Sequence, residues 1–139
     1  MSKTFEESLV SELLAVQDIA GVVGNRVYES TLPQKGIIPA IVYHTTTELH
    51  PVHLTGRGTV RTESVEIDII TASKATTRYI LDRIQNHFFR DDFRGVMGTG
   101  VTVLETTPQS VDSQYMRLSD GSDRAVRVAT VSFTMRYSK

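Results

Sequence analysis

Cysteine and tryptophan are both absent from this chain of 139 residues. Without cysteine the protein has no disulfide, no thiolate metal site and no cysteine nucleophile. Long apolar runs are also missing: no stretch approaches the roughly 20 residues that a membrane-spanning helix needs. The N-terminal segment lacks the apolar stretch of a signal peptide. We therefore expect a protein that is made in a reducing, cytosol-like compartment.

An excess of positive charge is absent too. The chain has 15 Lys and Arg residues against 16 Asp and Glu residues, for a formal net charge of -1. This balance argues against a protein that holds nucleic acid mainly through bulk positive charge. The hydrophobic content of 40% and the charged content of 22% are typical of a globular protein. The length predicts one domain over residues 1–139.

Hydrophobic periodicity predicts a first helix near the N-terminus. Thr4 and Glu7 fit a capping box at its start, and Gly21 and Gly24 would end it. Its apolar stripe contains Leu9, Leu13, Val16 and Ala20. A helix with such a wide apolar face needs a sheet to cover it.

A second helix is predicted from a cap at Thr71 or Ser73 to a point near Arg90. Its apolar stripe consists of Thr77, Ile80, Leu81, Ile84 and Phe88. His87 lies on the flank of this helix, where we expect a partly buried structural histidine. Gly95, Gly98 and Gly100 follow a helix and precede a strand, the wrong order for a phosphate-binding loop, and we interpret them as turn residues.

Strands are predicted at 40–47, at 59–71 and at 125–137, with a short one that begins at Val101 and stops at Pro108. In the strand at 59–71, alternation places Val65, Ile67 and Ile69 on one face and Glu66 and Asp68 on the other. The last strand changes its alternation near Ala129, which predicts a β-bulge there.

The segment from Gln109 to Arg124 is rich in Ser, Asp and Gln and is expected to be a long loop. It contains Tyr115, Met116 and Leu118. Aromatic and Met side chains are enriched at the centres of protein interfaces. We therefore predict that this segment packs on a neighbouring subunit or another protein.

His50 and His53, with Glu48 nearby, form the one grouping that looks like a metal site. Zinc needs three or four ligands in a fixed geometry, which two loop histidines around a proline do not provide, so we interpret them as exposed polar residues. His44 is expected on a sheet face. Glu63, like Glu66 and Asp68, is expected on the polar face of its strand.

No motif for a nucleophilic serine or a catalytic triad is present. We therefore expect no enzyme activity, no bound metal and no cofactor.

The order of segments resembles the tail-completion proteins of long-tailed bacteriophages, also called tail terminators or tail-to-head joining proteins. The resemblance rests mainly on Gly24-Asn25-Arg26-Val27-Tyr28 and on the segment from Pro39 to Tyr43. The strand at 65–69 and the C-terminal strand ending Phe133-Thr134-Met135-Arg136-Tyr137 follow in the same order. It covers nearly the whole chain. The matching motifs are determinants of the fold, and none of them is catalytic.

This resemblance implies an α+β fold with two helices on one face of a mixed or antiparallel sheet. From the segments above we expect four to five strands and long loops. It also implies a homo-oligomeric ring, usually a hexamer, at the head-proximal end of the tail tube. The ring's partners would be the tail tube protein and the head connector or stopper protein. DNA would pass through the channel without specific binding. The protein would assemble in the host cytoplasm and reside in the virion.

Two sets of residues become candidates for such a ring. The subunit or tail interface is expected to use loop residues, namely His50, His53, Arg57, Tyr115, Met116 and Leu118. Glu66 and Asp68 are expected to face the channel, where carboxylates would repel the phosphates of the passing duplex. Three alternatives stay open: a head-completion or stopper adaptor of the same assembly, a small metal-assisted enzyme using His50 and His53, and a small regulatory binding module.

Overall fold

The structure is a computed structural model that describes residues 2–33, 36–48, 60–89, 93–98, 101–117 and 125–138. These ranges contain three helices and six strands. In chain order the elements are α1 (Ser2–Ala15), α2 (Gln17–Val23), β1 (Val27–Glu29), β2 (Ala40–Glu48), β3 (Val60–Thr71), α3 (Lys74–Phe88), β4 (Gly95–Met97), β5 (Val101–Arg117) and β6 (Ala125–Ser138). The α+β class is confirmed, with one more helix and at least one more strand than expected.

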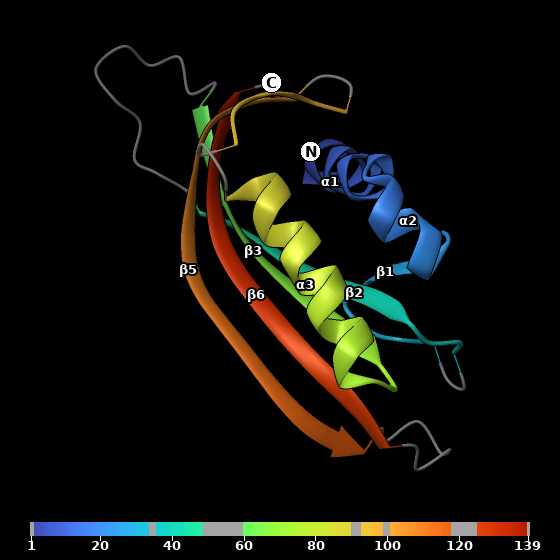
Figure 1. The fold of residues 1–139 in the computed structure, drawn as a ribbon. Helices are drawn as coiled ribbons and strands as arrows, with labels where there is room; N and C mark the ends of the chain where they lie inside the picture. The colour runs from blue at the N-terminus through green and yellow to red at the C-terminus, as the bar shows by residue number, and fades with distance from the viewer. Residues whose placement is uncertain are drawn as a thin grey trace.

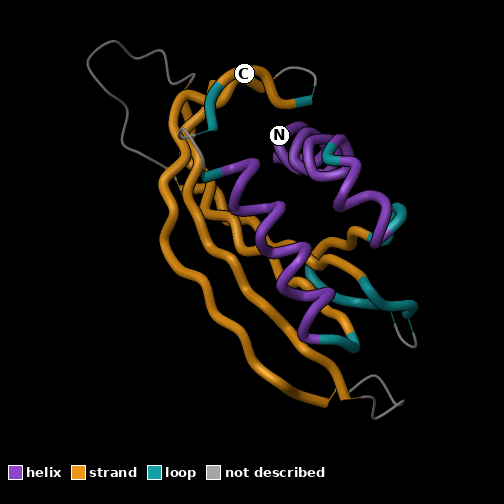
Figure 2. The backbone as a smooth tube through the Cα atoms, in the orientation of Figure 1, coloured by secondary structure: helices purple, strands orange, loops and turns teal. Residues whose placement is uncertain are grey.

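The six strands form one mixed sheet in the order β1-β2-β3-β6-β5-β4. β1 pairs with β2 in parallel, and every other neighbouring pair is antiparallel. The sheet curves around α3, and the helices lie together on its concave side (Figures 1 and 2). The expectation of helices on one face of a mixed or antiparallel sheet therefore holds. We call the helix-covered side the inner face and the opposite side the outer face.

The main core lies between the helices and the inner face. On β3 it contains Val65, Ile67 and Ile69, the residues that the alternation assigned to one face. Burial of each such aliphatic side chain is worth about 1.5–3 kcal/mol. The helices contribute Phe5, Leu9 and Leu13 from α1, Ile19 and Val23 from α2, and Ile80, Ile84 and Phe88 from α3.

The predicted first helix is in fact two helices. α1 begins at Ser2, so Thr4 lies inside it and the predicted capping box is wrong. The chain becomes extended at Val16 and bends there, which lets both Leu13 and Ile19 enter the same core. Gly21 lies within α2 and does not end it. Gly24 does, with a positive φ of 63° and its N–H donating to the Ala20 carbonyl at 2.8 Å.

The second predicted helix is confirmed as α3. Ser73 is its N-cap, and its hydroxyl accepts a hydrogen bond from the Thr76 N–H at 3.3 Å. The other candidate cap, Thr71, is buried and its hydroxyl contacts that of Thr77 at 2.6 Å. The predicted stripe faces the core, with Leu81 partly buried at its edge.

The expected loop from Gln109 to Arg124 is largely a strand. β5 continues through Pro108 to Arg117 and pairs with β6, and residues 118–124 lie outside the described ranges. The register shifts between Val103 and Glu105 and again between Pro108 and Ser110. Proline lacks an N–H for the ladder and is tolerated at such an irregularity. The polar composition that suggested a loop belongs to a strand whose side chains from 107 to 115 are exposed.

The expected bulge near Ala129 is also wrong. β3 and β6 stay in register there, with Ile69 opposite Ala129 and Ile70 opposite Val128. The alternation changes because the first part of β6 buries its outer-face residues, whereas the part from Ala129 onward buries its inner-face residues. A second, smaller core on the outer face contains Val42, Ile70, Val126 and Val128, packed against Tyr28, Leu32 and Ile38.

The two segments that carry the resemblance lie side by side. β1 pairs with the start of β2, so Val27 stands beside Ile41. The Arg26 side chain fixes this junction: its Nε donates to the Pro39 carbonyl at 2.9 Å and its Nη2 to the Val22 carbonyl at 3.1 Å. One arginine therefore joins the end of α2 to the entry of β2.

Gly98, directly after β4, lies against α1. Gly98 adopts a positive φ of 59°, and a Cβ built on it would lie 2.7 Å from the Ser8 Cα. A backbone atom cannot move away as a flexible side chain can. Glycine is therefore required here both for its conformation and for the close approach.

We predict that Gly98→Ala lowers the free energy of unfolding by about 1–3 kcal/mol, because the methyl group overlaps α1. Urea denaturation followed by circular dichroism measures this change. Gly21→Ala is the matched control, since nothing lies within 4 Å of the position that a Cβ would take there. It sits in a helix and should raise stability by about 0.5–1 kcal/mol. Equal effects of the two substitutions would contradict the packing of Gly98 on Ser8.

Candidate interaction surfaces

The described residues include only part of the predicted interface set. His50, His53, Arg57 and Leu118 lie outside them, and Met116 lies in β5 without a described side chain. Tyr115, Glu66 and Asp68 are described. In the part of the chain that the structure describes, every helix is too short or too polar to span a bilayer.

Tyr115 lies near the end of β5 and is 58% exposed. The Arg127 guanidinium lies over its ring, 5.2 Å from the centroid, across the β5–β6 pair. Such a cation–π contact at an exposed site contributes about 0.5–1 kcal/mol and orients both side chains. Tyr115 is therefore an exposed strand residue in contact with Arg127, and not a loop residue.

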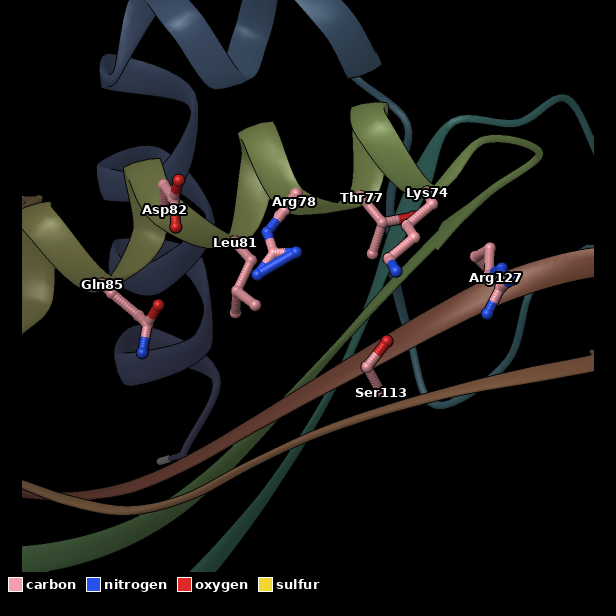
Figure 3. A pocket seen from close by; sticks show the side chains of 8 residues that line it. All are labelled: Lys74, Thr77, Arg78, Leu81, Asp82, Gln85, Ser113 and Arg127. Atoms are coloured by element: carbon pink, nitrogen blue, oxygen red, sulfur yellow. The ribbon is translucent and has the colours of Figure 1, made fainter.

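A groove of about 420 Å³ separates α3 from the β5–β6 hairpin (Figure 3). Its walls carry three cationic side chains, Lys74, Arg78 and Arg127, against one carboxylate, Asp82. Leu81 and Thr77 form part of the helix wall, and Ser113 comes from β5. The surplus of positive charge favours an anionic occupant.

This groove exists because α3 is narrower than the sheet. The helix packs on β3 and β6. On β6, Val131 is fully buried, whereas its partner Val111 on β5 is 44% exposed. Val111 and Tyr115 thus present apolar surface on the inner face of β5 beside the groove. Exposed apolar groups rimmed by charge are typical of protein interaction sites.

Glu66 and Asp68 lie on the outer face, as the alternation predicted. Glu66 is exposed, and Asp68 is half-buried. The Thr130 hydroxyl on β6 donates to Asp68 Oδ1 at 2.8 Å, and His44 Nε2 on β2 lies 3.5 Å from Asp68 Oδ2. His44 is the direct cross-strand partner of Glu66.

These outer-face residues form a cluster that the sequence alone did not reveal. The ligand atoms of His44, Glu66 and Asp68 all lie within 4.8 Å of one another. Sequence reasoning interpreted His44 as a sheet-face residue and considered His50 and His53 instead. The register between β2 and β3, which depends on the length of the connection between them, was the missing signal.

Glu63 does not lie on the polar face. It is 1% exposed on the inner face, where the Thr47 hydroxyl donates to both of its carboxylate oxygens at 2.9 and 3.0 Å. The Tyr137 hydroxyl donates to Oε1 at 3.2 Å. Burial raises the pKa of Glu63, and the hydrogen bonds from Thr47 and Tyr137 oppose part of that rise. Burial, reinforced by the negative charge of Glu63, raises the pKa of Tyr137 to about 12.

His87 is half-buried, as expected for a structural histidine. Its Nε2 lies 2.6 Å from Glu12 Oε2, which joins α3 to α1. The ring also packs against Phe88 and Phe93 at centroid distances of 4.9 and 5.4 Å. These contacts are those of a fold determinant.

The architecture is that of a small α+β domain with a curled mixed sheet. It is similar to a chain in the solved structure of the virion of a native gene transfer agent (GTA) particle. The superposition has a TM-score of 0.52 and 16% sequence identity, and it covers 96% of this chain and 91% of that chain. The likeness shows a shared fold. No protein-family model and no curated protein sequence matches the chain.

We predict that Glu63 makes stability fall as pH rises. Between the pKa of about 4.3 in the unfolded chain and the raised pKa in the native state, the native protein binds more protons than the unfolded one. Ionisation of the buried carboxyl at higher pH therefore costs stability. Glu63→Gln removes this contribution. The free energy of unfolding of the variant, minus that of the unsubstituted protein, should therefore increase as pH rises from the unfolded-state pKa to the native-state pKa of Glu63.

Urea denaturation at a series of pH values measures the effect. Glu66→Gln is the matched control, since it makes the same change on the solvent-exposed face of the same strand. A difference between Glu63→Gln and the unsubstituted protein that stays constant with pH would contradict the prediction.

Proposed function

We propose that this protein is a structural component of a tailed, phage-like virion that closes the tail tube as a tail terminator. The observation that carries the proposal is the fold shared with a chain of the GTA virion over nearly the full length of both chains. The order of the Gly24–Tyr28 and Pro39–Tyr43 segments, which Arg26 joins in space, supports the same assignment.

In this proposal the chain assembles as a homo-oligomeric ring, a hexamer in the assembled particle. The ring sits at the head-proximal end of the tail, stops tube polymerisation and joins the tube to the head connector or stopper protein. It is built in the host cytoplasm and acts without catalysis, metal-dependent chemistry or a cofactor. Each contact with a neighbour would bury about 800 Å² of a subunit, which the 7874 Å² surface of the chain accommodates several times over.

In this proposal the lateral contact between subunits lies at the groove beside α3. Tyr115 and Val111 offer apolar surface there, and Lys74, Arg78 and Arg127 offer charge to an acidic neighbour. When each copy contacts the next through two different surfaces, the copies close into a ring if the rotation from one copy to the next is a whole-number fraction of 360°. The groove and its complement on the next copy would form such a heterologous contact.

The outer face would then line the channel. Its uncovered part carries Glu66 and Asp68, because the helices occupy the inner face. Carboxylates in a confined channel repel DNA phosphates, which keeps the duplex mobile rather than bound. This arrangement fits a conduit through which DNA passes without specific recognition.

We predict that the purified chain forms rings when mixed with the tail tube protein of its particle. Mass measurement in solution gives the copy number, and negative-stain imaging shows the ring. The double variant Val111→Ser/Tyr115→Ser should remain folded and lose ring or tail joining, because the inner face of β5 loses its exposed apolar surface.

Tyr79→Ser is the matched control. Tyr79 is also an exposed tyrosine with an arginine over its ring, since Arg83 lies 4.6 Å from its centroid, but it is not among the residues that line the groove. Tyr79→Ser should assemble normally. A single copy bound to the tube would contradict the ring, and normal joining by the double variant would show that the hairpin is only a spacer.

For the channel, we predict that Glu66→Lys/Asp68→Lys leaves ring assembly intact and slows genome ejection, most strongly at low salt. Lysines in the lumen would attract the phosphates, and salt screens that attraction. Ejection from variant particles, followed by fluorescence of released DNA, measures the rate. As matched single variants, Glu66→Lys should slow ejection, whereas Glu7→Lys, which makes the same charge change on the exposed side of α1, should leave the rate unchanged. Equal slowing by Glu7→Lys and Glu66→Lys would remove the argument for a channel position.

A further inference from the structure

The cluster of His44, Glu66 and Asp68 on the outer face has the composition of a metal site. Within the described ranges it is the one group of three His, Cys, Asp or Glu side chains placed to share an ion. Its members come from the middle of β2 and β3, two paired strands of the sheet, rather than from a loop. Glu66 and Asp68 are therefore held between β2 and β6, and His44 is held by its pairing with β3.

The geometry of one pair matches that of two ligands on one ion. Zn²⁺ binds imidazole nitrogen and carboxylate oxygen at roughly 2.0–2.2 Å in tetrahedral geometry. Two such ligands lie about 3.4 Å from each other. His44 Nε2 and Asp68 Oδ2 are 3.5 Å apart. Glu66 stands opposite His44 in the register, and its carboxylate lies within 4.8 Å of the other two ligand atoms. A small side-chain rotation would bring it to the same ion.

The neighbouring strand supplies the orientation that a metal site needs. Thr130 on β6 stands opposite Asp68 and donates its hydroxyl proton to Oδ1 at 2.8 Å. This hydrogen bond uses one lone pair of Oδ1 and orients the carboxylate with Oδ2 3.5 Å from His44 Nε2. Hydrogen bonds of this kind hold ligating carboxylates in place and typically contribute 10- to 100-fold to metal affinity.

We propose that His44, Glu66 and Asp68 bind a divalent first-row transition-metal ion such as Zn²⁺, with water completing the coordination. The imidazole selects this class over Mg²⁺ and Ca²⁺, which prefer all-oxygen ligand sets. The ion would tie β2 to β3 on the exposed face, and the repulsion of DNA described above belongs to chains without a bound ion. The site lies within one chain, so it does not depend on the ring proposed above.

The test is Zn²⁺ titration of the tag-free, full-length protein by calorimetry, with Co²⁺ absorption as a report of the coordination geometry. We expect one ion per chain. His44→Ala, Glu66→Gln and Asp68→Asn should each weaken binding by at least about tenfold, and Thr130→Val should weaken it by about tenfold through the lost hydrogen bond. Mg²⁺ should not compete at equal concentration.

Two control variants separate this site from the other histidines of the chain. His50→Ala/His53→Ala removes the histidines of the 49–59 segment, and His87→Ala removes the pair with Glu12. Both should bind Zn²⁺ as the unsubstituted protein does. Circular dichroism of every variant establishes that its fold is retained. Unchanged affinity in His44→Ala, or loss of binding in His50→Ala/His53→Ala alone, would overturn the proposal.

Discussion

The pairing of β3 with β2 on one side and β6 on the other is the constraint on which the rest of the structure depends. β3 is a central strand, so successive side chains must point to opposite faces of the sheet. Val65, Ile67 and Ile69 enter the core under all three helices, and Glu66 and Asp68 consequently face away from it. A shift of one residue in this register would bury the two carboxylates and expose the aliphatic residues.

The covering of the sheet is uneven on both faces, and this unevenness creates the surfaces available for function. On the outer face, Tyr28, Leu32 and Ile38 pack on the apolar end around Val126 and Val128, whereas Glu66, farther along the face, is exposed among the described residues. On the inner face, α3 covers β3 and β6 but leaves Val111 and Tyr115 of β5 exposed. A chain with one open polar face and one open groove has the two kinds of surface that a ring with a channel requires.

Much of the fold follows from local signals in the sequence. The stripe of α3, its cap at Ser73 and the alternation on β3 are short-range patterns, and the structure has all three. The wrong predictions concern tertiary context: the second half of β5 resembles a loop because its exposed, Ser-rich residues lie outside the cover of α3, and the change of alternation at Ala129 comes from a second core, not a bulge. The buried position of Glu63 could have been predicted, because it precedes Val65 by two residues and therefore lies on the same face of β3. The His44 cluster could not, since it needs the register of two strands.

Reconstruction of the head-to-tail junction of the intact particle by electron cryomicroscopy tests the central proposal most directly. We expect a closed ring of copies of this chain at the head-proximal end of the tail tube, with the outer face of each sheet toward the lumen and the α3 groove filled by the next copy. A single copy at the junction, a position elsewhere in the particle, or Glu66 and Asp68 on the outer rim of the ring would contradict it.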